Sequence, residues 1–169
     1  MQLTDICPIE KWVELEKEIH DRFGLDSNVF NVDGIRISEF KAWANKLCQA
    51  IKATDKGQSF ICAVAHMNLA IMAKNSGQAV VEECDAGLTK IVIPICIQDT
   101  FLGAVGACGL LMDDGEVDAF LVNKMTDIDE EKVESLSEGI GSVSSEGIQE
   151  LIDFIEERIK SILSAADGA

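Results

Sequence analysis

Basic residues are scarce in this sequence, and the shortage argues against the commonest polyanionic partners. There are 14 lysines and arginines against 30 aspartates and glutamates, which gives a formal net charge of −16. A chain with this charge repels nucleic-acid phosphates and anionic membrane surfaces. We therefore expect neither a nucleic acid nor a membrane as a partner.

Long apolar runs and an export signal are absent as well. No segment approaches about 18 apolar residues without a charge, and the first residues lack the basic stretch, apolar run and cleavage site of a signal peptide. We therefore expect a cytoplasmic protein. In that reducing compartment its six cysteines would be free thiols, core residues or metal ligands rather than disulfides.

The short motifs of common enzyme classes are also missing. The sequence has no GxSxG elbow, no GxGxxG after a strand, no GxxxxGKS/T loop and no HExxH pair, and it contains only two histidines. The acidic residues at 113–118 and 127–131 form runs, which are typical of solvated faces rather than of paired catalytic carboxylates. We expect a protein without catalytic activity.

The length and composition fit one globular domain over residues 1–169, with 47% hydrophobic and 26% charged residues. Apolar spacing predicts helices at residues 9–23, 40–52, 58–75, 129–138 and 144–163, and a frayed tail at 164–169. Segments rich in Val and Ile predict antiparallel strands at residues 79–83, 89–97 and 101–112. Asp33-Gly34, between two alternating apolar segments, predicts a hairpin. This order predicts an α+β fold in which helices flank an antiparallel sheet of about five strands, as in the PAS and GAF folds.

Three cysteines and a histidine form the first candidate site. Cys62 and His66 are four residues apart in a predicted helix, so both side chains project from one face. Cys48 and Cys84 stand near the ends of neighbouring predicted elements. Together the four would suit a tetrahedral zinc or iron site. The alternative is that the cysteines are small buried hydrophobic residues and His66 an ordinary core or surface residue, since the sequence has no CxxC pair.

The last predicted strand has glycine at every third position, at Gly103, Gly106 and Gly109. Glycine inside a strand marks a bulge or the close approach of another group. This strand therefore either lines a binding pocket between the sheet and the helices or packs tightly against a helix.

The last predicted helix carries an apolar stripe at helical spacing, which either packs on the sheet or forms a homodimer or signalling surface. The stripe consists of Ile148, Leu151, Ile152, Ile155, Ile159 and Leu163.

Several segments also follow the pattern of a known family. They are Leu47-Cys-Gln-Ala-Ile, Gly57-Gln-Ser-Phe-Ile-Cys62, Glu83-Cys-Asp-Ala-Gly-Leu88, Val92-Ile-Pro-Ile-Cys and Phe101-Leu-Gly103. Between about Leu3 and Leu163, the chain resembles the PocR sensory domain. The resemblance implies a PAS-like domain of bacterial and archaeal signalling proteins, with small hydrocarbon derivatives such as diols as proposed ligands. The matching positions are Cys48, Cys62, Cys84, Ala86, Gly87, Pro94 and Gly103.

Two features depart from the family pattern. The Gly-Gln pair expected after Gly103 is replaced by Ala107-Cys108-Gly109, and no output domain follows. We therefore expect either a protein that acts through a signalling partner or a part of a longer chain.

The sequence thus predicts a sensory domain that binds a small molecule or a metal. The alternative is a protein whose cysteines hold zinc, an iron–sulfur cluster or haem. The expected ligand-binding residues are Cys48, Cys62, Cys84, Gly87, Gly103 and Cys108, and the expected metal ligands are Cys48, Cys62, His66 and Cys84.

Overall fold

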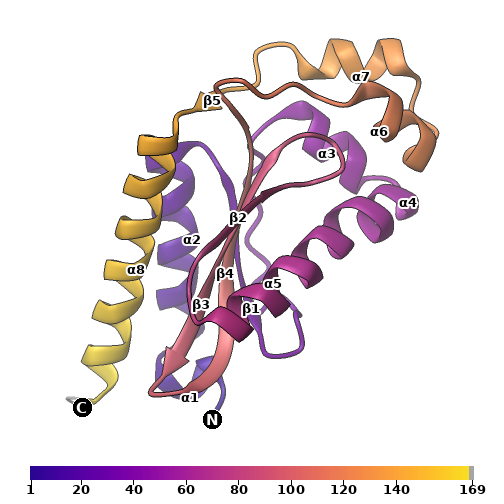
Figure 1. Ribbon diagram of the computed structural model, residues 1–169. Helices are drawn as coiled ribbons and strands as arrows, with labels where there is room; N and C mark the ends of the chain where they lie inside the picture. The colour runs from indigo at the N-terminus through magenta and orange to yellow at the C-terminus, as the bar shows by residue number, and fades with distance from the viewer. Residues whose placement is uncertain (168–169) are drawn as a thin grey trace.

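A five-stranded sheet forms the centre of the fold (Figure 1). The structure is a computed structural model, and the residues that it describes are 1–167. Four antiparallel strands follow one another across the sheet in the order β1 (Asp26–Asn31), β4 (Thr100–Met112), β3 (Thr89–Ile97) and β2 (Val80–Glu83). The short strand β5 (Ser142–Val143) pairs with β4 in parallel.

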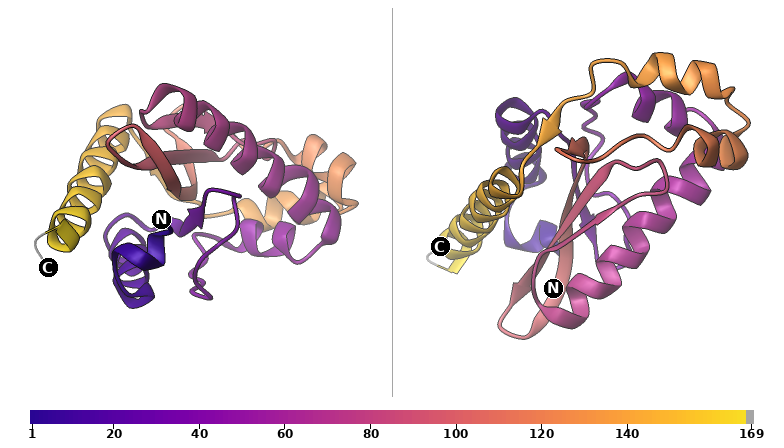
Figure 2. Two further views of the ribbon diagram at one scale, coloured as in Figure 1. Left: turned by 90° about the horizontal axis from the view of Figure 1, so that it is seen from below. Right: turned by 45° about the horizontal axis from the view of Figure 1, so that its top comes forward.

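Helices cover both faces of this sheet. Helices α2 (Ile9–Phe23) and α8 (Ser145–Asp167) lie side by side on one face, and α5 (Val64–Ser76) crosses the other (Figures 1 and 2). The short helix α1 (Leu3–Ile6) precedes α2. One end of the sheet is covered by α3 (Lys46–Lys52), α4 (Asp55–Gly57), the π-helical segment η1 (Gln58–Ala63), α6 (Ala119–Thr126) and α7 (Glu130–Ser137). Among the described helices, none is both long and apolar enough to cross a membrane.

Alternate residues of the central strands face opposite helical layers, because side chains along a strand point to opposite sides of the sheet. Ile91, Ile93 and Ile95 of β3 are buried in the core that the sheet shares with α2 and α8. Val92, between them, is buried against Leu69 of α5. The side of the sheet that faces α5 is the side on which the candidate site lies.

The sheet and helices confirm the predicted α+β class, with an antiparallel sheet of five strands flanked by helices. The meander of β2, β3 and β4 lies where the sequence predicted it. Helix α2 has the predicted bounds and ends at Gly24, whose φ of +73° is a left-handed conformation that glycine adopts without strain.

Four local predictions need correction. Helix α3 begins at Lys46 rather than at residue 40, because the side chain of Asn45 caps it by accepting the Cys48 N–H. The chain turns at Asp33-Gly34 and returns along the free edge of β1, where the Ile37 N–H donates to the carbonyl oxygen of Val29, but it forms only a bridge between Phe30 and Arg36 and no second strand. Helix α6, which was not predicted, is capped by Asp118. Residues 164–167 of the predicted tail are helical, and residues 168–169 lie outside the described residues.

The apolar stripe of α8 is buried within the chain, in the core that it shares with α2 and the sheet. Ile155 is 0% exposed, and Ile148, Leu151, Ile159 and Ile162 belong to the same buried cluster. The residues on which the predicted homodimer was based are therefore occupied by packing inside the chain.

This packing predicts the stability of two matched variants. Ile155→Ala should lower the free energy of unfolding by about 2–5 kcal/mol, because it removes buried contacts and leaves a cavity. Ile71→Ala on α5, where Ile71 is 56% exposed, should change it by less than about 0.5 kcal/mol. Urea unfolding followed by circular dichroism measures both values. Equal effects would show that α8 does not pack as described.

Candidate ligand-binding site

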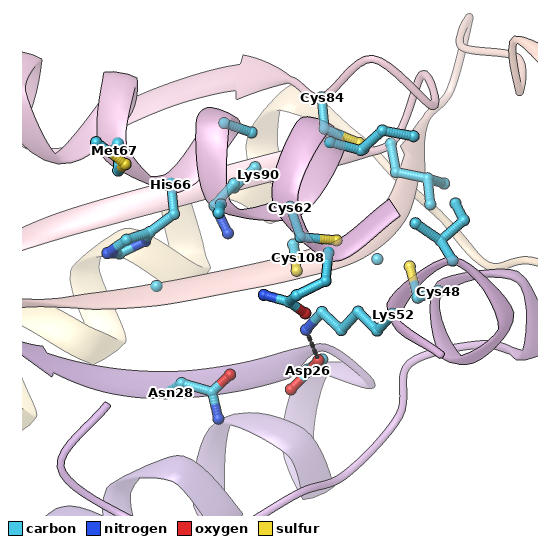
Figure 3. A pocket seen from close by; sticks show the side chains of 18 of the residues that line it. Asp26, Asn28, Cys48, Lys52, Cys62, His66, Met67, Cys84, Lys90 and Cys108 are labelled. Atoms are coloured by element: carbon cyan, nitrogen blue, oxygen red, sulfur yellow. Dashed lines mark hydrogen bonds and ion pairs between the residues drawn. The ribbon is translucent and has the colours of Figure 1, made fainter. Parts of the chain in front are cut away.

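A cavity of about 200 Å³ lies between the sheet and the helices η1 and α5 (Figure 3). Its volume exceeds that of an engineered cavity of about 150 Å³ that binds benzene, so it has room for a small organic molecule. The cavity exists because Gly106 and Cys108 of β4 present little side chain to the α5 side of the sheet. Further lining residues include Asn28, Cys48, Ile51, Lys52, Gln58, Ile61, Cys62, His66, Cys84, Ala86, Leu88 and Lys90.

Most of the residues predicted from the sequence meet at this cavity, although they come from five separate segments. Cys48 lies on α3, Cys62 on η1 and His66 on α5. Cys84 follows β2 in the turn before β3, and Cys108 lies on β4. Their roles in binding stay predictions, but the structure does bring the five side chains to one place (Figure 3).

Two predicted residues lie elsewhere. Gly87 is a turn residue with φ +85°, and a Cβ atom there would stand 2.2 Å from the carbonyl oxygen of Glu116. Gly103 lies on β4, where a Cβ atom would stand 2.2 Å from the carbonyl oxygen of Phe30. Both glycines permit close approach of the backbone, and neither lines the cavity.

Polar contacts at the helix ends hold α3 and η1 over the cavity. The side chain of Asn45 donates to the carbonyl oxygen of Gly109 on β4 at 2.7 Å, which ties the start of α3 to the sheet. Gly57 packs against the end of α3, where a Cβ atom would stand 2.2 Å from the carbonyl oxygen of Ile51. Cys48 and Cys62 are thereby fixed on neighbouring walls.

Burial keeps three of the cavity thiols, those of Cys48, Cys62 and Cys84, protonated at neutral pH. Burial raises the pKa of Cys62 to about 11. Burial is also the main reason why the pKa values of Cys48 and Cys84 are raised. Because the thiolate is the nucleophilic form, these three cysteines are poor nucleophiles and present small apolar groups to the cavity.

His66 is buried and neutral. Its ring stacks on Phe30, with 3.6 Å between ring centroids, and it approaches β4 at Gly106, where a Cβ atom would stand 3.5 Å from Nδ1. Burial, followed by the charges of Lys90, Arg36 and Lys52, lowers the pKa of His66 to about 3. Neither ring nitrogen has a hydrogen-bond partner among the described residues. Buried polar atoms are usually paired, so this ring retains unused hydrogen-bonding capacity.

The predicted metal site finds no support in the structure. Within residues 1–167, no group of three or more His, Cys, Asp or Glu side chains is arranged to hold a metal ion. Figure 3 shows the reason: the imidazole of His66 lies at one end of the cavity and Cys48 at the other. Cys48, Cys62, His66 and Cys84 share the cavity without converging on one point.

Sequence reasoning missed the charged residues of the cavity. Lys52 of α3 pairs with Asp26 of β1, with 2.7 Å between Nζ and Oδ2 (Figure 3). Lys90 of β3 also lines the cavity. A usable signal for it was present, because Lys90 is the only charged residue in the segment Thr89–Ile97. Asp26 carried no such signal, because its partner lies 26 residues away on a helix.

Comparison with known proteins gives one match. The family described as the sensory domain found in PocR matches residues 5–167, nearly the whole chain. No curated protein and no solved structure matches the chain. The amide that the family pattern led us to expect after Gly103 is absent there, but Gln58 of η1 supplies an amide side chain to the cavity lining.

The buried state of His66 predicts a pH dependence of stability. The folded-state pKa of about 3 lies below the unfolded value of about 6.5, so the unfolded state binds more protons between these values and stability falls as the pH falls through this range. Between about pH 7.5 and pH 5.5, the wild type should lose about 1 kcal/mol more than His66→Phe, which keeps a ring on Phe30 but does not titrate. Urea unfolding at the two pH values measures this difference. Parallel losses in the two proteins would mean that His66 titrates as an exposed histidine.

Proposed function

The chain belongs to the PocR sensory-domain family, and from this premise we propose that it binds a small organic molecule in the cavity beside the sheet. The observation that carries the proposal is the composition of the cavity walls. Ile51, Ile61 and Leu88 supply apolar surface, while Asn28 and Gln58 supply a few polar groups. Small-molecule sites are commonly built in this way, with polar groups that orient the ligand among apolar walls.

We further propose that the domain senses its ligand and does not transform it. Cys62 is kept protonated by burial, which raises its pKa to about 11. The ring nitrogens of His66 form no hydrogen bond to a thiol or to any other described residue. An activated cysteine needs a nearby base or a lowered pKa, and the described cavity residues provide neither.

A change in the cavity walls on ligand binding can be transmitted to α6 and α7 through a shared hydrophobic cluster. Several cavity residues, among them Cys48, Ile61 and Leu88, also belong to the buried cluster that holds Val122 of α6 and Val133 of α7. A ligand that displaces this shared wall would therefore shift the packing of α6 and α7. We propose these two helices as the reporting elements, whereas α8 packs in a separate cluster with α2.

A signalling partner is the proposed recipient of this change. The outer side of η1 and α5 exposes three apolar side chains at helical spacing, Phe60, Val64 and Ile71, none of which lines the cavity. The inner side of the same elements lines the cavity through Cys62 and His66. We place the protein in the cytoplasm, in agreement with the free thiols of all six cysteines.

Cavity-filling variants test the binding proposal. Diols, alcohols, aldehydes, amides and carboxylates of three to six carbon atoms are screened by thermal unfolding. A binding class should raise the Tm of the wild type, by several degrees at a ligand concentration of about 100 Kd. Cys108→Phe should abolish the shift by occupying the cavity, whereas Cys96→Phe should retain it, because Cys96 does not line the cavity.

The two variants also define the contrary result. Circular dichroism checks that each variant is folded. If Cys108→Phe does not fold, Cys62→Leu replaces it, because it fills the cavity from the opposite wall. A ligand-induced shift that survives both cavity substitutions would place the binding site elsewhere. If no class shifts the Tm of the wild type, the proposal of a small organic ligand fails.

A further inference from the structure

Lys90 brings an unpaired positive charge into the cavity. It lies on β3 opposite Cys108 of β4 and is only 7% exposed. Figure 3 shows its side chain directed into the cavity between His66 and Cys62. No acidic residue of the described chain forms an ion pair with it. Glu82, its neighbour across the sheet on β2, is exposed to solvent and makes no such pair.

The other two basic residues of the cavity lining, Lys52 and Arg36, each have a hydrogen-bond partner, but among the described residues only Lys52 has an acidic one. Lys52 is paired with Asp26, which is 2% exposed. Arg36 donates a hydrogen bond to the side-chain oxygen of Asn28, a neutral group. The remaining acidic lining residue, Asp33, is exposed in the turn after β1. Three basic and two acidic residues therefore line the cavity, although the whole chain carries a net charge of −16.

The position of His66 supports the same electrostatic picture. After burial, the influences that lower its pKa are Lys90, Arg36 and Lys52, and no carboxylate opposes them. The imidazole therefore lies in a region of positive potential. Being neutral, it carries one N–H group, and neither ring nitrogen has a partner in the described residues. Both Lys90 and His66 are thus donors that lack an acceptor.

A buried ammonium without a counter-charge is costly, and this cost is relieved when an anion enters. A carboxylate would form a charge-assisted hydrogen bond with Lys90, which is stronger than one between neutral groups. Among the described lining residues, Lys90 is the one deeply buried cation without a counter-charge, since the guanidinium of Arg36 is half-buried, hydrogen-bonded to Asn28 and partly screened by solvent. One carboxylate is therefore enough to balance the buried charge. The thiols and apolar side chains around it suit a short hydrocarbon body, which limits the ligand to the size that about 200 Å³ admits.

We propose that the cavity selects a small monocarboxylate, whose carboxylate group binds Lys90 and whose apolar body lies against Cys62, Cys108 and Ile61. This inference rests on the proposed function and narrows it to one class of ligand. It differs from the neutral diols that the family resemblance implies. His66 donates the second hydrogen bond to the ligand.

Matched pairs of charged and neutral ligands test the inference. Isothermal titration calorimetry compares butyrate with butyramide and 1-butanol, and benzoate with benzamide, on the intact chain. The carboxylates should bind the wild type at least about tenfold more tightly than their neutral counterparts. Lys90→Met should remove this preference and Lys90→Arg should retain part of it. Lys124→Met, at an exposed position on α6, should bind as the wild type does.

The outcomes separate this inference from the proposed function. Neutral ligands that bind the wild type as tightly as the carboxylates, or a carboxylate affinity unchanged in Lys90→Met, would overturn the inference and leave the proposed function standing. Absence of binding by both classes would also overturn the inference, and the proposed function would then be decided by the wider ligand screen described above. The comparison of carboxylate with amide on the wild type needs no variant, so it decides the matter even if Lys90→Met is unstable.

Discussion

The two faces of the central strands impose the constraint on which the rest of the structure depends. A strand buried between two helical layers needs apolar side chains at every position, and β3 meets this demand from Ile91 to Ile95. On the face of the sheet that contacts α5, the positions near η1 are occupied by Lys90, Gly106 and Cys108 rather than by large apolar residues. The space that these residues leave unfilled is the cavity. The candidate site is thus a local interruption of core packing.

A buried carboxylate on the opposite side fixes the strand that borders this space. Glu16 of α2 is 0% exposed and accepts hydrogen bonds from the Val29 N–H at 2.8 Å and from the Ser38 hydroxyl at 2.6 Å. Burial raises the pKa of Glu16, against the effect of these two hydrogen bonds. The contacts join α2, β1 and the segment after β1. They hold β1 so that its alternate residues Asp26, Asn28 and Phe30 face the cavity.

The sequence allowed individual helices and strands to be predicted, whereas it did not allow side-chain contacts between them to be predicted. The apolar period of α2 and the Val- and Ile-rich meander predicted the elements and the sheet, because local spacing alone decides which face is buried. The cysteines indicated the cavity only through the spacing of a family. The pairing of Lys52 with Asp26 had no local signal, since it depends on how α3 lies over β1. The hairpin at Asp33-Gly34 is shorter than predicted, because the segment after the turn pairs with β1 only through the bridge at Arg36.

The same reasoning explains why the sequence suggested a metal site and why the structure, over the residues that it describes, gives that site no support. Spacing four residues apart places Cys62 and His66 on one side of a helix, but it does not fix which way each ring or thiol turns. In the folded chain the imidazole of His66 stacks on Phe30 and lies close to Gly106 of the sheet. Burial keeps the Cys62 thiol protonated. A metal site needs ligands that converge on one point, and the described residues form no such group. The apolar wall that includes Cys48, Cys62 and Cys84 lies beside the unpaired Lys90, and this combination supports the proposal of an amphipathic anion rather than a cation.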